Sequence, residues 1–300
     1  MDMPLAPAGL IERSHAWESS AGNGVRLRGR RREAAPGEPT LHFLPGNGFA
    51  GGVYWPFLRA LPASWGLFLH DIEGHGASDA PPRFSGIGAL ARRIPDVMRE
   101  QGLLDGRPLI GMGHSFGGAM TLKLAADHPA LFRAAVLLDP IAIPPVPWFF
   151  WRGSGRFGLN PMARGARRRR TRWASRAEAV ERLRGRGIFA GWTGEALDCF
   201  VDSATRDEGG ARVLCCPPEL EAQIYEHPLW TWPAFRAAQV PVLFLHGASS
   251  YAFFPRAAEL ARRSNPRVRV ATLPGRHCFM QEHPPEAAAA VHRFVADVPR

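Results

Sequence analysis

The chain of 300 residues is poor in cysteine and has no long apolar run. Its cysteines are not spaced as a C-x-x-C pair, which argues against a zinc site or a disulfide framework and predicts reduced, mostly buried thiols. They are Cys199, Cys215, Cys216 and Cys278. No segment approaches about 18 consecutive apolar residues, so we expect no membrane span. The N-terminal segment lacks a basic start followed by an apolar run, so we expect no signal peptide and a cytoplasmic location.

Lysine is almost absent. Lys123 is the single lysine, so nearly all of the positive charge behind the net charge of +10 is carried by arginine. Arginine is concentrated at residues 26–33 and 163–173, but it is also spread along the rest of the chain. Because no nucleic-acid-binding motif accompanies the clusters, we interpret them as solvated surface and expect no nucleic-acid partner. The second cluster, Arg164 to Arg172, could still attract an anionic substrate.

Short apolar runs, each followed by a turn rich in glycine, proline or polar residues, are typical of buried strands in a parallel sheet. These runs are residues 40–46, 65–71, 107–115, 134–140, 240–247 and 267–275. Stretches of helical character lie between most of them. This repetition of strand, turn and helix predicts an α/β fold with a mostly parallel central sheet flanked by helices. Residues 14–32 are expected to add antiparallel edge strands.

The alternation stops at residues 141–236, where no buried-strand run of this kind occurs. This stretch begins with prolines and aromatic residues and continues with the second arginine cluster and several helical segments. We therefore predict a mainly helical insertion at residues 141–236, placed before the penultimate core strand. Residues 1–140 and 237–300 would form the core.

Residues 113–117 read Gly-His-Ser-Phe-Gly, with glycine two positions on either side of Ser115. A serine held in a sharp turn between a strand and a helix needs small neighbours at these two positions. The N-terminus of the following helix would direct free N–H groups at developing negative charge. A glycine-rich turn without chemistry is the alternative. The predicted strand before Ser115 and the predicted helix after it favour a nucleophile.

A serine nucleophile also needs a base and an oxyanion site. His277 lies just after the last predicted strand and before the C-terminal helix, which favours it over the other histidines as the base. The loop at residues 45–49 contains two glycines that let the chain approach a substrate closely. The backbone N–H groups of Asn47 and Phe116 are the predicted oxyanion donors.

In their order along the chain, these stretches resemble the motifs of the α/β-hydrolase fold family. The loop PGNGF (45–49) resembles the family's oxyanion loop, and GHSFG (113–117) is similar to its nucleophile elbow. HDIEGHGASDAP (70–81) resembles its D-x-x-G-H-G-x-S turn, and PGRHCFMQEHPPE (274–286) its histidine loop. The resemblance covers nearly the whole chain. It implies the α/β-hydrolase fold, and it implies structural roles in the turn for Asp71, His75 and Ser78.

The chain departs from the commonest family pattern at the acid. Most members have an aspartate three residues after the glycine that ends the penultimate core strand, and here that position is Ser250. No acid follows before Glu259. A branch that includes haloalkane dehalogenases takes its acid from the preceding strand, which here ends at Asp139. The resemblance therefore implies Asp139 as the acid of the triad. A capping role for Asp139 before a proline, with a broken triad, is the alternative.

A serine at the elbow, in place of the aspartate of the dehalogenase branch, implies an acyl-serine intermediate. The expected function is hydrolysis of carboxylic esters with small to medium apolar groups, with no metal or organic cofactor. In this family such an insertion forms a cap over the active site. Phe49 and Trp148 are predicted to line the substrate pocket. For Trp148 and the aromatic residues that follow it, docking of the cap on the core is an equally good explanation, so Phe49 is the better candidate. Thioester, lactone or carbon–carbon bond hydrolysis, perhydrolysis, and a non-catalytic ligand-binding role remain alternatives.

Overall fold

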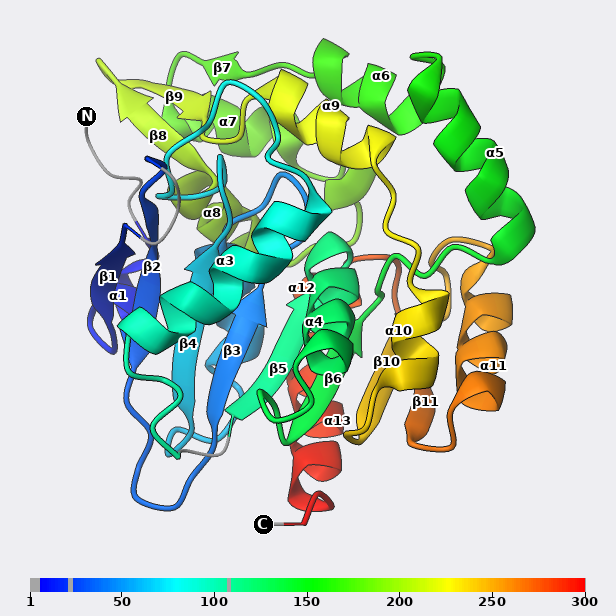
Figure 1. Ribbon diagram of the computed structural model, residues 1–300. Coiled ribbons are helices and arrows are strands. Elements are labelled where there is room, and N and C mark those ends of the chain that lie inside the picture. The colour runs from blue at the N-terminus through cyan, green and yellow to red at the C-terminus, as the bar shows by residue number, and fades with distance from the viewer. Residues whose placement is uncertain (1–5, 21–23, 107–108, 300) are drawn as a thin grey trace.

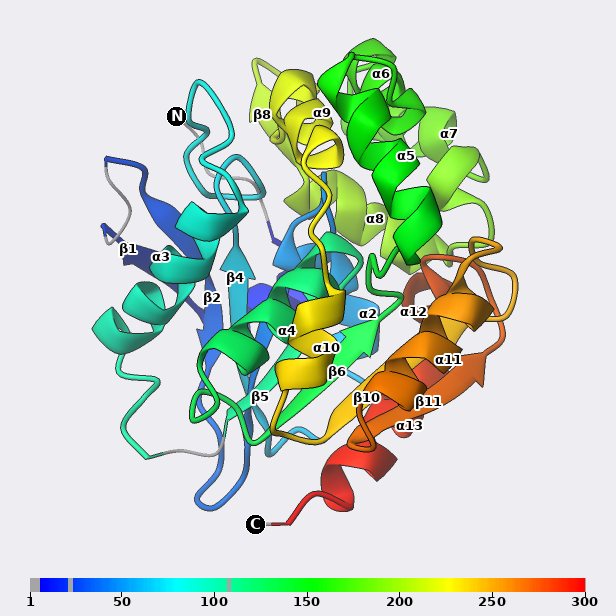
Figure 2. The ribbon, with the colours of Figure 1, turned by 45° about the vertical axis from the view of Figure 1, so that its right-hand side comes forward.

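The computed structural model describes residues 6–20, 24–106 and 109–299. The first residues of the N-terminal segment lie outside this range, as do the first two residues of the strand predicted from position 107. A central sheet runs through the molecule, helices cover both of its faces, and a separate group of helices lies over one end (Figures 1 and 2).

The central sheet has the strand order β1-β2-β4-β3-β5-β6-β10-β11. Strands β1 and β2 are antiparallel edge strands, and the others run parallel. The six predicted core strands and the predicted edge strands are confirmed. Their bounds are β1 His15–Ser19, β2 Leu27–Arg32, β3 Thr40–Leu44, β4 Gly66–Asp71, β5 Leu109–His114, β6 Ala134–Leu138, β10 Val242–Gly247 and β11 Val268–Leu273.

The helices of the core connect these strands and bury apolar side chains against the sheet. Several begin with proline in the first turn, where its missing N–H breaks no helical hydrogen bond. Their bounds are α1 Ala8–Ile11, η1 Gly51–Tyr54, α2 Trp55–Leu58, α3 Ile87–Glu100, α4 Phe116–Asp127, α10 Trp232–Ala237, α11 Phe254–Ser264, α12 Phe279–Glu282 and α13 Pro284–Ala296.

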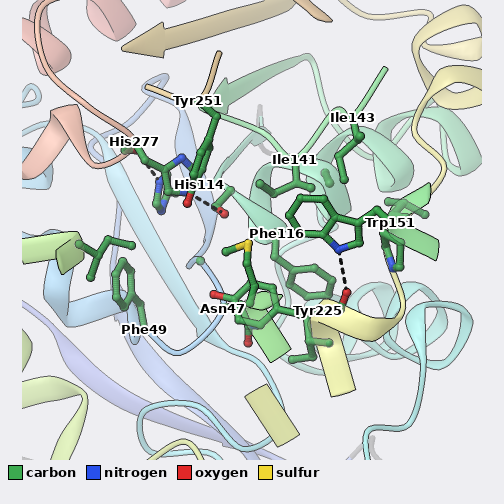
Figure 3. Close-up of a pocket in the computed structure, with 18 residues that line it drawn as sticks. Asn47, Phe49, His114, Phe116, Ile141, Ile143, Trp151, Tyr225, Tyr251 and His277 are labelled. Atoms are coloured by element: carbon green, nitrogen blue, oxygen red, sulfur yellow. Dashed lines mark hydrogen bonds between the residues drawn. The ribbon is translucent and has the colours of Figure 1, made fainter. Parts of the chain in front are cut away.

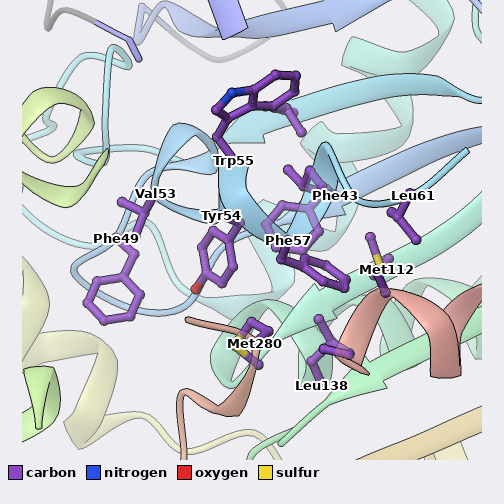
Figure 4. Close-up of a cluster of buried hydrophobic side chains, with 14 of the residues drawn as sticks. Phe43, Phe49, Val53, Tyr54, Trp55, Phe57, Leu61, Met112, Leu138 and Met280 are labelled. Carbon is purple, nitrogen blue, oxygen red and sulfur yellow. The ribbon is translucent and has the colours of Figure 1, made fainter. Parts of the chain in front are cut away.

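Two apolar clusters lie on opposite faces of the central sheet, because successive strand residues point to opposite sides. On one face, Phe43, Met112 and Leu138 pack with Phe57 and Met280 (Figure 4). On the other face, the alternate strand residues pack against α3, α4, α10 and α11. This double coverage explains why the parallel strands read as continuous apolar runs in the sequence.

The segment between β6 and β10 contains the group of helices at the end of the sheet, which we call the cap (Figure 2). It also contains a three-stranded sheet, β7-β9-β8, which the sequence did not predict, because these strands are short and partly charged. The last helix of the predicted insertion, α10, packs against α4 of the core. The bounds are α5 Pro145–Arg156, α6 Pro161–Arg168, β7 Arg172–Trp173, α7 Arg176–Leu183, η2 Gly187–Phe189, α8 Gly194–Ser203, β8 Thr205–Glu208, β9 Ala211–Leu214 and α9 Pro218–Glu226.

Candidate active site

Ser115 lies in the turn between β5 and α4, at the carboxyl edge of the sheet. Its backbone has φ 55°, in the left-handed region that non-glycine residues rarely adopt. The flanking glycines allow this turn. A Cβ atom at Gly113 would lie 2.4 Å from the carbonyl of Gly117, and a Cβ atom at Gly117 would lie 2.2 Å from the Leu44 oxygen. The spacing of the motif is therefore required by close backbone packing.

Ser115, His277 and Asp139 meet in one hydrogen-bonded row. His277 Nε2 lies 3.0 Å from Ser115 Oγ, and His277 Nδ1 lies 2.7 Å from Asp139 Oδ2. Asp139 is fully buried, and its φ of 45° is also in the left-handed region. Within the described part of the chain, Ser115 and Asp139 are the only non-glycine residues with positive φ. Backbone strain of this kind persists where the surrounding structure imposes it, and it often marks functional sites.

Ser250 occupies the position at which the commonest family pattern has an aspartate. It contacts Asp139, the acidic residue that follows the neighbouring strand β6. Its hydroxyl donates a hydrogen bond to Asp139 Oδ2, and the Gly247 N–H donates to Oδ1 at 2.9 Å. The Asp139 carboxylate thus has donors from β10, from the loop after it and from His277. The sequence did not predict this role of Ser250, and only its position three residues after Gly247 could have suggested it.

Asn47 and Phe116 bring their backbone N–H groups to the same edge of the sheet. Among the described residues, neither N–H has an acceptor within the protein. Phe116 is the first residue of α4, where N–H groups lie outside the helical hydrogen-bond ladder. The cap holds the Asn47 side chain in place, because Asn47 Nδ2 donates to the Glu221 carbonyl at 2.9 Å.

The turn after β4 supports this loop. His75 Nε2 accepts a hydrogen bond from the Gly48 N–H at 2.9 Å, and Nδ1 lies 2.9 Å from the Glu73 carbonyl. Burial lowers the pKa of His75 to about 4, so its ring stays neutral and keeps an acceptor nitrogen at Nε2. Asp71 accepts from the Gly51 N–H at 2.7 Å.

A buried chain of hydrogen bonds connects the loop at residues 45–49 to the loop that contains His277. The Gly46 N–H donates to Tyr54 Oη at 3.0 Å, and Tyr54 Oη lies 2.7 Å from His114 Nδ1. His114 Nε2 lies 2.9 Å from the His277 carbonyl. Since a carbonyl only accepts, Nε2 carries the proton of His114 and Tyr54 donates to Nδ1. Burial lowers the pKa of His114, which favours this neutral form.

A largely apolar pocket of about 670 Å³, partly open to solvent, lies against Ser115 and His277 (Figure 3). Phe49 lines it, but Trp148, the other residue predicted to line the substrate pocket, does not. The structure corrects this prediction. Trp148 packs against Trp230, at 4.7 Å between ring centroids, and Trp151 lines the pocket instead. The other apolar lining residues include Phe116, Ile141, Ile143, Met162, Ile188, Ile224 and Leu229.

The second arginine cluster is largely paired with acids of the cap. Arg167 lies 2.7 Å from Glu219 and 2.6 Å from Glu226. The other pairs are Arg169–Glu221, Arg170–Glu178 and Arg172–Glu208. These arginines therefore serve to hold the cap elements to one another.

All four cysteines are free and buried, as predicted. Across residues 6–20, 24–106 and 109–299, no cluster of three or more histidine, cysteine or acidic side chains is arranged to hold a metal ion. Over the same ranges, no helix has both the length and the apolar character needed to cross a bilayer.

Comparison with known proteins identifies the family to which the chain belongs. A sequence profile described as "Alpha/beta hydrolase family" matches residues 43–291. The abhydrolase domain-containing protein ACTT2 of Alternaria alternata is 34% identical over 95 residues, which are 32% of this chain and 32% of that protein. The type I acyl-CoA thioesterase mpaH of Penicillium roqueforti is 35% identical over 103 residues, 34% of this chain and 22% of that protein. The chain thus matches a third or less of the length of these relatives.

Solved structures resemble the chain over nearly its full length. The structure of E-2-(acetamidomethylene)succinate hydrolase covers 94% of this chain and 99% of its own, with a TM-score of 0.73 and 22% identity. The thioesterase domain from the curacin biosynthetic pathway has the same coverage and TM-score, at 16% identity. At these identities the likeness shows the fold, with its mostly parallel central sheet flanked by helices.

Proposed function

Because the chain belongs to the alpha/beta hydrolase family, we propose that it is a serine hydrolase that cleaves carboxylic esters of small to medium apolar substrates. The observation that carries this proposal is the row of contacts from Ser115 through His277 to Asp139, at 3.0 Å and 2.7 Å. A serine hydroxyl is a weak nucleophile by itself, and an oriented histidine within hydrogen-bond reach activates it.

In the acylation step, Ser115 Oγ attacks the ester carbonyl carbon and His277 Nε2 takes the hydroxyl proton. The C–O bond to the leaving alcohol then breaks, and His277 returns the proton to that oxygen. Asp139 holds the ring by accepting from Nδ1–H and stabilises the imidazolium while it exists. The N–H groups of Asn47 and Phe116 stabilise the oxyanion, and losing one such donor typically lowers the rate by roughly 10²–10³.

In the deacylation step, water takes the place of the alcohol. His277 removes a proton from the water as its oxygen attacks the acyl-serine, and the acid product leaves as the proton returns to Ser115 Oγ. Charge develops on the same carbonyl oxygen, so the same donors act in both steps.

The pocket supports the choice of an apolar substrate. Phe49, Trp151 and the aliphatic side chains around them leave few polar groups besides the reacting ones. Such a lining binds apolar groups mainly by removing them from water. Trp151 comes from α5 and Met162 from α6, so we propose that the segment after Asp139 acts as a cap that completes the pocket. Because α10 packs on the core, we place the end of this cap before α10.

Labelling with a fluorophosphonate probe tests the nucleophile. We expect the folded protein to form a covalent adduct at Ser115, and we expect Ser115→Ala to form none. Ser85→Ala is the matched control, because this serine precedes α3 outside the pocket, and it should label normally. A folded wild-type protein that does not react would contradict the proposal and favour a non-catalytic ligand-binding role.

Thioester hydrolysis is the second candidate. It is favoured by the likeness to an acyl-CoA thioesterase over a third of the chain and by the fold shared with a thioesterase domain. Turnover of p-nitrophenyl esters of increasing chain length, with matched acyl thioesters and a lactone alongside, separates the candidates. Higher kcat/KM for the thioester than for the ester of the same acyl group would favour the second candidate.

A further inference from the structure

Helix α5 of the cap has an apolar face that is exposed to solvent. Val146, Phe149, Phe150 and Phe157, the residue that caps α5, are 66–75% exposed, and Leu159 just after them is 61% exposed. At 3.6 residues per turn, the first four fall within an arc of about 100° on one side of the helix. Single exposed apolar residues are ordinary, but a contiguous stripe of this kind marks a binding surface. We call this stripe the α5 face.

The opposite side of α5 is already in contact with the cap. Trp151 Nε1 donates to the Tyr225 carbonyl at 3.2 Å, and a Cβ atom at Gly155 would lie 2.8 Å from the Glu226 carbonyl. Both contacts are with the end of α9. Helix α5 therefore does not need to turn its apolar face inward to be held in place. Figure 1 shows it along the outer edge of the cap.

The segment that contains the α5 face carries charge of one sign. Residues 140–177 contain arginines but no aspartate or glutamate. Arg152 and Arg156 flank the α5 face on the helix itself, and Arg164 and Arg168 are exposed on α6. Over the described ranges, none of these four arginines has an ion-pair partner. The rest of the cluster is neutralised by acids of the cap, as described above.

We propose that the α5 face docks on an anionic lipid surface. A helix with exposed aromatic and aliphatic side chains flanked by arginine binds at the boundary between lipid head groups and acyl chains. Each arginine near an anionic surface strengthens binding roughly fivefold. A second copy of this chain fits less well, because the same unpaired arginines would face one another. This proposal concerns the surface alone and holds whether or not Ser115 is a nucleophile.

Docking would also place the pocket close to the lipid. Trp151 and Met162, which belong to α5 and α6, line the pocket from the inner side of the same two helices. An apolar substrate dissolved in the bilayer could then reach the pocket without crossing water.

Co-sedimentation of the full-length protein with vesicles tests the proposal. We expect binding to phosphatidylcholine vesicles that contain phosphatidylglycerol, weaker binding as salt is raised, and at least about tenfold weaker binding to pure phosphatidylcholine. Replacing both phenylalanines (Phe149→Ser with Phe150→Ser) should weaken binding by roughly tenfold or more. The variant Arg152→Gln with Arg156→Gln should do the same and should reduce the salt dependence.

Matched variants keep the result specific to α5. Ile11→Ser with Leu104→Ser removes exposed apolar residues elsewhere. Arg83→Gln with Arg92→Gln removes two positive charges from the surface of the core region, as many as the α5 variant removes. Both should bind as wild type. All α5 variants should unfold at the wild-type temperature, because the altered side chains are exposed. Absence of wild-type binding to the anionic vesicles would overturn the proposal. It would also be overturned by a wild-type dimer in light scattering that Phe149→Ser with Phe150→Ser converts to a monomer.

Discussion

The carboxyl edge of the sheet and the cap use their carboxylates differently. At the edge, the buried Asp139 carboxylate accepts hydrogen bonds from a backbone N–H, a serine hydroxyl and the His277 ring. In the cap, Glu219 and Glu226 share the partly exposed guanidinium of Arg167. The arrangement around Asp139 at the carboxyl edge thus depends on a few buried contacts that water cannot replace. The cap depends on several contacts that water can replace. We therefore expect the two regions to respond to different perturbations.

Replacing the acid at the edge should have the largest effect. Asp139→Asn keeps the shape of the side chain but presents an amide to His277, which disfavours the ring tautomer that can accept a proton at Nε2. We expect kcat for ester hydrolysis to fall by roughly 10⁴ with little change in unfolding temperature.

The control for this variant is Glu259→Gln, which alters the next acid after Ser250 in the sequence. Glu259 is paired with Arg262 and Arg263 on α11, so its loss should leave kcat unchanged. If Glu259→Gln and not Asp139→Asn abolished turnover, the assignment of the acid would be wrong.

Mild acid should weaken the core more than the cap. Burial lowers the pKa of His42 to about 3 and that of His75 to about 4, and it lowers the pKa of His70 and His114 as well. The unfolded chain protonates these rings near pH 6.5 and the folded chain does not, so the free energy of unfolding falls as pH drops below about 6.5. Asp71 opposes this loss, because burial raises its pKa to about 6 and its folded form takes up a proton first.

Between pH 7 and pH 5 the four rings together cost roughly 7–8 kcal/mol and Asp71 returns roughly 1 kcal/mol, so we expect a net loss of about 6 kcal/mol. Urea unfolding at both pH values measures it. His128→Gln is the control, because this exposed side chain should leave the difference unchanged. A free energy of unfolding that is equal at pH 7 and pH 5 would contradict the neutral, buried state of these rings.

A smaller effect is expected from breaking the buried chain of hydrogen bonds that runs through Tyr54 and His114. Tyr54→Phe removes the hydroxyl that accepts from Gly46 and donates to His114, and it leaves both partners unpaired. We expect a loss of roughly 1–3 kcal/mol in stability. We also expect a fall in kcat of roughly tenfold at nearly constant KM, because displacements below 1 Å matter at a reacting centre.

Phe43→Leu separates packing from hydrogen bonding. Phe43 packs on the Tyr54 ring, at 4.6 Å between centroids, and makes none of these hydrogen bonds. It should lower stability and leave kcat intact. Equal kcat values for Tyr54→Phe and the wild type would mean that this chain of hydrogen bonds has only a structural role.

The smallest effect should come from the cap. Arg167→Gln removes two ion pairs, but Arg167 is about one-third exposed, so solvent already screens them. We expect a change below about 1 kcal/mol that shrinks further in high salt. Arg168→Gln, which removes a charge with no ion-pair partner among the described residues, should have no effect. If Arg167→Gln lowered the free energy of unfolding by several kcal/mol, the expected difference between the carboxyl edge and the cap would be wrong.

The sequence was sufficient for features that depend on neighbours along the chain. The parallel strands are buried on both faces and therefore read as apolar runs, and the turn around Ser115 needs glycines at fixed spacing. The order of strands then brings Ser115, Asp139 and His277 to one edge. The contact of Ser250 with Asp139 was not predictable in this way, because it depends on how the loop after β10 turns back towards β6.

The cap was harder to predict for a related reason. Residues 148–151 are all aromatic, so the sequence does not reveal which side of α5 faces inward. Packing against the end of α9 decides it, and that contact selects Trp151 over Trp148 for the pocket. The small sheet β7-β9-β8 escaped prediction because its strands are short and gain their stability from partners distant in sequence.

The left-handed backbone at Ser115 has a consequence for engineering. Glycine adopts this conformation without strain, so Ser115→Gly should make the fold more stable while it removes the hydroxyl that we propose as the nucleophile. A selection for heat resistance alone would favour such a change. Thermostable variants of this protein therefore need to be screened for turnover in every round, since stability and activity compete directly at this residue.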